Sequence, residues 1–231
     1  MMLTKKIVLT AAFGLLFVCG FAQEDYRKIF GRDYERALRY LDEEKWMNEI
    51  ILSQGLNPKE VKAVVFPELI RFSALQDKFE TFALESLYSQ YGKAYANFSI
   101  GEFQIKPSFA EVIEKDFMNL FREKTFGIYP SDTVENIPNR AARVKRLKDK
   151  KAMLNYVLVF FKVMEKNYPA WKSADEKIKF FACAYNSDYR KTEKEIRAMI
   201  NKKFFSASLT SSTNYSYSDI ALFFYKHQSG N

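Results

Sequence analysis

The helix start that decides the fold reads Asn57-Pro58-Lys59-Glu60-Val61-Lys62-Ala63-Val64-Val65-Phe66-Pro67-Glu68. Asn57 is a favourable helix cap, and Pro58 suits a first turn because its missing amide hydrogen has no helical partner there. Glu60 stands where a capping box places its carboxylate. The residues that follow are mostly apolar. The stretch therefore predicts a helix that enters the core and carries the carboxyl group of Glu68 into it.

Helices dominate the pattern on both sides of this stretch. The Ser/Thr-x-x-Glu signature of a capped helix recurs at Ser108/Glu111, Ser173/Glu176 and Thr192/Glu195. Apolar residues at helical spacing predict further helices at residues 34–52, 77–90, 152–166 and 218–227. Residues 206–216 are predicted to form a loop, and only residues 96–106 are expected to be short and extended. We predict an α+β fold, predominantly α-helical, with a small strand region at 96–106 lining a groove.

The amino terminus has the pattern of a signal peptide. Lys5 and Lys6 precede an apolar run, and small residues follow it, so residues 1–22 are predicted to be removed by cleavage before Gln23. Lipid attachment at Cys19 is a weaker alternative, because Val18 stands where a lipobox has a small residue. No stretch is long and apolar enough to predict a membrane span. We expect an exported protein, periplasmic or secreted, with a single domain at 23–231.

Composition excludes several classes of catalytic site. The only histidine is His227, which argues against a Ser-His-Asp triad, a Cys-His pair and a histidine-rich zinc site. No glycine-rich phosphate loop is present. Cys183, the one cysteine after the signal peptide, lies among apolar residues that predict a buried, inert thiol. We therefore expect no metal and no cofactor, and carboxylates remain as the candidates for catalysis.

Three segments resemble the soluble lytic transglycosylases of the lysozyme-like superfamily. The stretch 57–68 is similar to the helix of that family that ends in its catalytic glutamate. Residues 101–110 (GEFQIKPSFA) resemble the Gly-Leu-Met-Gln-x-x-Pro-x-Thr-Ala segment, and residues 181–186 (FACAYN) resemble the Ala-Ala-Tyr-Asn motif. The resemblance implies a lysozyme-like fold, Glu68 as the catalytic acid, and Gln104 and Tyr185 as residues that contact the sugar and the glutamate, respectively.

The chain also departs from the family pattern. Leu69 replaces the usual serine, Glu102 replaces leucine, and Ser187 breaks the usual Ala-Gly after Tyr-Asn. The interval from Glu68 to Gln104 is longer than in the family. Within it, Glu85-Ser86 supplies the Glu-Ser pair closer to Gln104, so Glu85 is an alternative acid that lacks the Asn-Pro helix start.

Local chemistry supports Glu68 beside the resemblance. Its neighbours are almost all apolar, so burial should raise its pKa and keep a proton available for a glycosidic oxygen. The non-catalytic alternatives are a glutamate that faces solvent and an ion pair between Glu68 and Arg71 on the next turn. Glu102, if it shares the groove face of a strand with Gln104, is a plausible second acid. Asn186 is either a substrate contact or a local brace.

A run of seven basic residues in the twelve from 140 to 151 offers a rival class of function. Its alternation with apolar residues predicts the solvated face of an amphipathic helix, and it lacks the aromatics of a nucleic-acid module, so no nucleic-acid partner is expected. The expected function is cleavage of peptidoglycan between N-acetylmuramic acid and N-acetylglucosamine, leaving 1,6-anhydro ends. The alternatives are hydrolysis and an inactive protein of the same fold that binds or scaffolds the wall.

Overall fold

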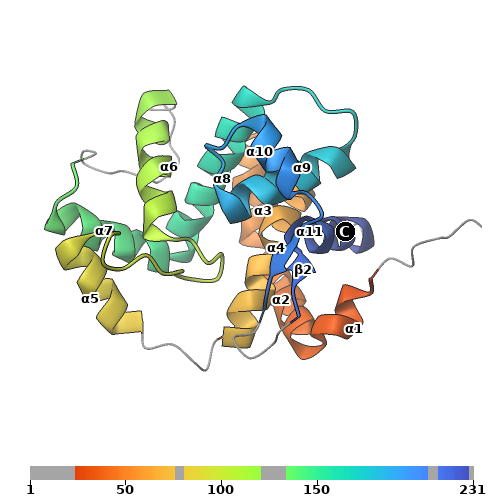
Figure 1. Cartoon of the computed structure of the whole chain (residues 1–231), viewed down its shortest axis with the longest axis horizontal. Coiled ribbons are helices and arrows are strands. Elements are labelled where there is room, and N and C mark those ends of the chain that lie inside the picture. Colours follow the sequence, from red (N-terminus) through yellow and green to blue (C-terminus); the bar gives the residue numbers. More distant parts are fainter. Residues whose placement is uncertain (1–23, 76–80, 121–133, 208–212, 229–231) are drawn as a thin grey trace, which may run out of the picture.

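The computed structural model describes residues 24–75, 81–120, 134–207 and 213–228, and this part of the chain is mainly helical (Figure 1). The predicted signal peptide at 1–22, its cleavage before Gln23 and Cys19 lie outside the described residues. The elements are α1 (Tyr26–Phe30), α2 (Arg32–Glu43), α3 (Trp46–Ser53), α4 (Pro58–Leu75), α5 (Thr81–Tyr91), α6 (Pro107–Leu120), α7 (Ile137–Lys148), α8 (Lys150–Asn167), α9 (Ala174–Ser187), α10 (Glu193–Met199), β1 (Lys203–Phe205), β2 (Tyr215–Ser216) and α11 (Tyr217–His227).

The predicted fold class, helical with a small β region, is confirmed, but the strands lie elsewhere than expected. The antiparallel pair is β1 with β2, in which Lys203 is opposite Ser216. The position of β2 also corrects the prediction of a loop throughout 206–216. The described chain therefore places its two-stranded sheet just before the last helix.

Residues 96–106 contain a tight turn, at 100–105, rather than a strand. A single bridge joins Ile100 to Ile105, with backbone hydrogen bonds of 3.0 and 3.1 Å. Gly101 and Gln104 both take left-handed φ values, 67° and 51°, which close the chain on itself instead of extending it. The prediction of a strand here is wrong because two left-handed residues are not visible in a hydropathy pattern.

Helix α4 begins as the sequence predicts. The side chain of Asn57 accepts the amide hydrogen of Lys59 at 2.9 Å. Glu60 does not complete the expected capping box; its carboxylate instead accepts a hydrogen bond from Lys177 of α9 at 2.6 Å. The helix continues through Pro67, and its central residues are buried.

The other predicted helix starts divide into two groups. Thr192 and Glu195 form a complete capping box at α10, and Ser173 caps α9. Helix α6 begins at Pro107 rather than after Ser108, and Glu111 turns inward to Tyr88 and Lys93.

The predicted helix at 34–52 is two helices, α2 and α3. Glu44 leaves the helical region between them, and its carboxylate accepts hydrogen bonds from Trp46 and Lys150. The helix therefore breaks at Glu44, which pairs with Lys150 of α8, and the spacing of apolar residues does not reveal this break.

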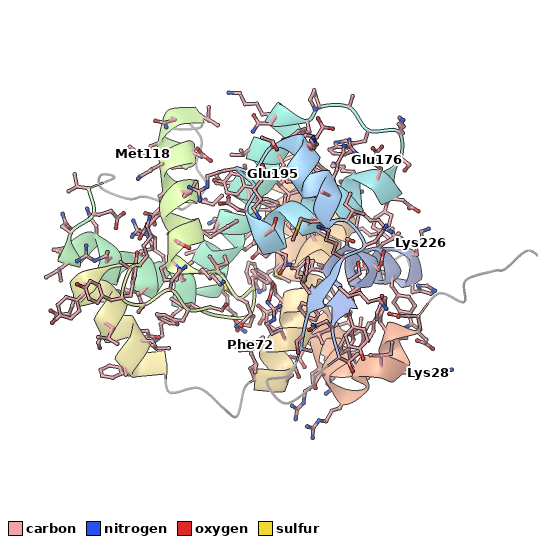
Figure 2. The ribbon with its side chains drawn as sticks, in the orientation of Figure 1. Lys28, Phe72, Met118, Glu176, Glu195 and Lys226 are labelled. Atoms are coloured by element: carbon pink, nitrogen blue, oxygen red, sulfur yellow. The ribbon has the colours of Figure 1, made fainter. Side chains whose placement is uncertain are left out.

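Helix α8 runs between two groups of helices. Figure 1 shows α5, α6 and α7 on the left and α1–α4 with α9–α11 on the right. In the right-hand group α4, α9 and α11 pack on one another, with the rings of Phe66 and Phe224 stacked at 3.9 Å between centroids. Figure 2 shows side chains filling the space between these helices while Lys28 and Lys226 extend outward. Cys183 is buried in this core, and burial raises the pKa of its thiol to about 11, as expected for an inert cysteine.

The left-hand group is held by a buried charged cluster. Its members are Tyr88 of α5, Glu111 and Glu114 of α6, Arg143 and Arg146 of α7, and Tyr156 of α8. Arg143 is 2% exposed and donates to Glu114 at 2.6 Å, while Arg146 donates to the other oxygen of Glu114 at 2.7 Å. The prediction that the basic run at 140–151 is a solvated face is therefore wrong at Arg143.

Candidate active site

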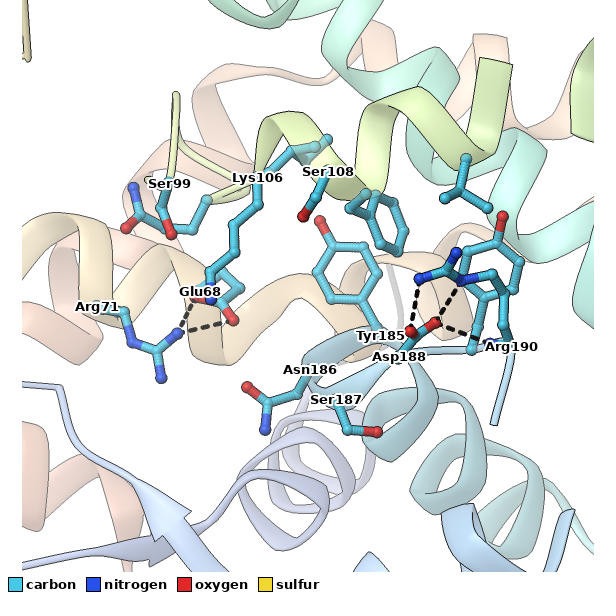
Figure 3. A pocket seen from close by; sticks show the side chains of 15 residues that line it. Glu68, Arg71, Ser99, Lys106, Ser108, Tyr185, Asn186, Ser187, Asp188 and Arg190 are labelled. Atoms are coloured by element: carbon cyan, nitrogen blue, oxygen red, sulfur yellow. Dashed lines mark hydrogen bonds and ion pairs between the residues drawn. The ribbon is translucent and has the colours of Figure 1, made fainter. Parts of the chain in front are cut away.

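A pocket of about 250 Å³ opens where α4, the 96–106 turn, α6 and the end of α9 meet (Figure 3). Glu68 and Arg71 of α4, Gln104 of the turn, and Tyr185 and Asn186 of α9 all contribute to its lining. Four predicted site residues, separated by up to 118 positions between Glu68 and Asn186, are thus brought to one place. We call it the Glu68 pocket.

Glu68 is 4% exposed, so its carboxyl group is almost completely removed from water. Arg71, one turn later, donates one amino group to both carboxylate oxygens at 3.0 and 2.8 Å. In Figure 3 the ammonium of Lys106 also extends toward Glu68. Burial raises the pKa of Glu68 above its ordinary 4.5, and it outweighs the opposing effects of Arg71, Lys106 and Tyr217.

Two buried tyrosines flank the carboxyl group. The Tyr185 hydroxyl donates to the carbonyl of Phe103 at 2.9 Å, so it ties α9 to the turn that carries Gln104. The Tyr217 hydroxyl donates to the carbonyl of Val64 at 3.1 Å. Burial, and then the nearby charge of Glu68, hold the pKa of both phenols well above the ordinary value. Tyr217 was not predicted as a site residue, because α11 carries no motif of the family.

Gln104 is presented by the left-handed turn. Its side-chain amide donates to the carbonyl of Gly101 at 2.8 Å, which leaves its oxygen available to the pocket. Gly101 is needed here, because a Cβ would lie 2.6 Å from the Met153 sulfur and 2.9 Å from the Leu147 carbonyl oxygen. The turn is therefore held against α7 and α8 on one side and faces the pocket on the other.

The structure does not bring Glu102 to the pocket. Its charge acts on Tyr40 and Lys150 instead. Because Gln104 is left-handed, Glu102 and Gln104 do not share the strand face that period-two alternation implied. Glu85, the alternative acid, lies on α5 and pairs with Lys148 at 3.1 Å, also away from the pocket lining.

A second carboxylate of the Glu68 pocket, Asp188, was not predicted. Arg190 donates to both of its oxygens, at 3.0 and 2.7 Å. Burial acts to raise the pKa of Asp188, but the hydrogen bonds and charge of Arg190 outweigh it, so the net pKa is lowered. Of the two carboxyl groups, only Glu68 is biased toward holding a proton.

No cluster of three histidine, cysteine or acidic side chains within the described ranges is arranged to hold a metal ion. None of the described helices is long and apolar enough to cross a membrane. The chain matches no family model, no curated protein and no solved structure. Kinship with the transglycosylases therefore stays a prediction from the three sequence motifs.

Proposed function

We propose that this protein cleaves the glycan strands of peptidoglycan as a lytic transglycosylase, with Glu68 as its acid and base. The observation that carries the proposal is the buried Glu68 carboxyl in a pocket that also gathers Gln104, Tyr185 and Asn186. A carboxyl group whose burial raises its pKa is suited to protonating a glycosidic oxygen near neutral pH.

The proposed reaction needs one catalytic carboxyl group. Glu68 gives its proton to the leaving oxygen as the bond to the anomeric carbon of N-acetylmuramic acid breaks. The hydroxyl on carbon 6 of the same sugar then attacks that carbon, and the Glu68 carboxylate takes the hydroxyl proton. A 1,6-anhydro ring forms, no water is consumed, and Glu68 is protonated again.

Supporting roles follow from the contacts. Gln104 presents its amide oxygen to the pocket and can accept a sugar hydroxyl or amide hydrogen. Tyr185 acts on the turn through Phe103 and is a positioning residue. Asn186, at the end of α9, lines the same pocket and supplies a further polar contact.

The alternative is an inactive protein that binds or scaffolds the wall, and the Glu68–Arg71 ion pair favours it. A guanidinium at 2.8 Å stabilises the carboxylate, which cannot donate a proton. For catalysis, Arg71 must move away from Glu68 when substrate enters, or the effect of burial on the Glu68 pKa must exceed that of Arg71. The raised pKa of Glu68 supports the second case.

Product analysis separates the candidates. Purified peptidoglycan is incubated with the protein, and soluble fragments are identified by mass spectrometry. The proposal predicts anhydro-muropeptides, each one water lighter than the hydrolytic product, and the same products from Glu102→Gln. Reducing-end products would make the protein a hydrolase and point to Asp188 as the second carboxylate. Co-sedimentation with the wall without release of fragments would support the binding protein.

A further inference from the structure

A second pocket, of about 560 Å³, lies between α1, α2, α3, the start of α4 and the end of α11. Figure 1 shows these helices together on the right of the molecule. None of the residues that line it also lines the Glu68 pocket. Its volume falls within the range of small-molecule sites.

Positive charge dominates the wall of this second pocket. Arg27, Lys45, Lys59 and Lys62 line it, and Asp42 is the only carboxylate among the lining residues. The described structure gives no ion pair to any of the three lysines. The pocket therefore favours an anion.

Lys62 is the most informative of these residues. It is 7% exposed, yet its ammonium has no hydrogen bond or ion pair within the described chain. Lys177, also poorly exposed, has two carboxylate partners, Glu60 at 2.6 Å and Glu165 at 3.0 Å. Burial lowers the pKa of Lys62, and only the charge of Asp42 opposes this. The side chain of Lys62 is thus mostly removed from water and lines the pocket without a protein partner for its charge, and a bound anion would supply that partner.

The start of helix α4 also favours an anion in the second pocket. Lys59 lies in the first turn of α4, where the helix dipole disfavours a cation and favours an anion. Lys62 follows one turn later and lines the same pocket. Lys59 also lies 4.9 Å from the centre of the Tyr225 ring, so Lys62 is the lysine whose charge has no such contact, and an anion in the pocket would attract both.

The rest of the wall suits an organic group. Leu38, Leu41 and Phe224 give it an apolar side, and the buried amide oxygens of Asn48 and Gln228 have no hydrogen-bond partner. Such oxygens accept hydrogen bonds from hydroxyl groups.

We infer that the second pocket binds a small organic phosphate, with the phosphate group at Lys59 and Lys62 and a hydroxyl-bearing body against Leu38, Leu41 and Phe224. A phosphate carries up to two negative charges, which suits several converging cations better than one carboxylate does. This site is independent of the proposed glycan cleavage.

Isothermal titration calorimetry of the purified protein tests the inference, with glucose 6-phosphate, inorganic phosphate and glucose as probes at constant ionic strength. We expect saturable binding of glucose 6-phosphate, weaker binding of inorganic phosphate and none of glucose. Absence of binding by glucose 6-phosphate, or equal binding of glucose, would overturn the inference.

Variants separate a built site from general surface charge. Lys62→Met should weaken glucose 6-phosphate binding about tenfold or more, the range for a lost charge-assisted hydrogen bond. It should also raise the melting temperature of the unliganded protein, because an unpaired buried charge is removed. Lys145→Met, at an exposed position of α7, is the matched control and should leave both unchanged. Equal weakening by both variants would show non-specific attraction and contradict the proposed site.

Discussion

Two buried carboxyl groups of this molecule, Glu114 and Glu68, have nearly the same exposure, 1% and 4%, but different surroundings. Glu114 lies in the charged cluster, where Arg143 and Arg146 come from another helix and Tyr156 donates to it at 2.5 Å. Glu68 has one arginine, from its own helix, and opens onto a pocket.

The difference indicates which buried charge serves the fold and which is available for chemistry. Every oxygen of Glu114 is bonded to groups that hold α6, α7 and α8 together, so its partners should matter for stability. At Glu68 burial outweighs the pairing and raises the pKa, so protonation is accessible.

The largest effect is expected at the charged cluster. Arg143→Met removes the donors to one oxygen of the buried Glu114 and to Glu135, and should lower the free energy of unfolding by about 3–5 kcal/mol. Urea denaturation followed by circular dichroism measures it. Arg197→Met, which removes ion pairs from a more exposed arginine, is the control and should cost less than about 1 kcal/mol. Equal losses would remove the distinction between structural and surface charge.

The second largest loss of stability is expected at the 96–106 turn. Gly101→Ala adds a methyl group against Met153 and Leu147 in a left-handed conformation, and should cost about 1–3 kcal/mol. Because the same turn presents Gln104, the release of wall fragments should fall as well. Gly55→Ala is the matched control, since Gly55 has the same φ of 67° and only the end of the Lys162 side chain, at 4.0 Å, near its added Cβ. A smaller loss in Gly101→Ala than in Gly55→Ala would show that close packing is not what requires glycine.

Arg71→Met tests the balance at Glu68. Removing the cation should raise the pKa of Glu68 further, so the alkaline limb of the pH–rate profile should move to higher pH. The same rise in the Glu68 pKa should make the folded variant less stable than the wild type at high pH. An acid whose pKa is raised in the folded state leaves the free energy of unfolding unchanged below its ordinary pKa of 4.5. As pH rises from there toward the folded-state pKa, the free energy of unfolding falls, because the unfolded chain loses the proton more easily.

The variant should therefore match the wild type in unfolding experiments near pH 4. At higher pH it should lose about 1.4 kcal/mol for each unit by which the Glu68 pKa rises, once the pH exceeds that pKa. A loss that is the same at all pH values would mean that Arg71 acts through its packing on Phe205, at 4.4 Å, rather than through Glu68.

The smallest change in stability is expected from Tyr185→Phe. The ring continues to pack, and one hydrogen bond to Phe103 is lost, which costs about 1 kcal/mol. If Tyr185 positions the turn, turnover should fall by more than this small destabilisation explains. Thermal melts and fragment-release rates, measured on the same preparation, decide between the two roles. Unchanged turnover would mean that Tyr185 only packs in the core and does not position the turn.

The sequence predicts contacts correctly where the two partners are only a few residues apart. The Asn57 and Thr192 caps were predicted correctly because a cap depends on neighbours two or three positions away. The gathering of Glu68, Gln104 and Tyr185 was also anticipated, through the ordered motifs rather than through any physical rule of spacing.

What escaped prediction depends on distant partners or on backbone angles. Arg143 was placed on a solvated face because nothing near it in sequence shows that Glu114, 29 residues earlier, would meet it. Asp188 joins the pocket lining, and Tyr217 approaches Glu68, only through tertiary packing. Glu102 was assigned to the groove by strand alternation, which a left-handed Gln104 does not obey.

The most direct test of the central claim is the rate at which soluble muropeptides are released from purified peptidoglycan by the wild type, Glu68→Gln and Glu85→Gln. The account predicts a loss of about 10²-fold or more for Glu68→Gln, with the fold intact, and a rate close to the wild type for Glu85→Gln. A wild-type rate in Glu68→Gln, or a comparable loss confined to Glu85→Gln, would contradict it.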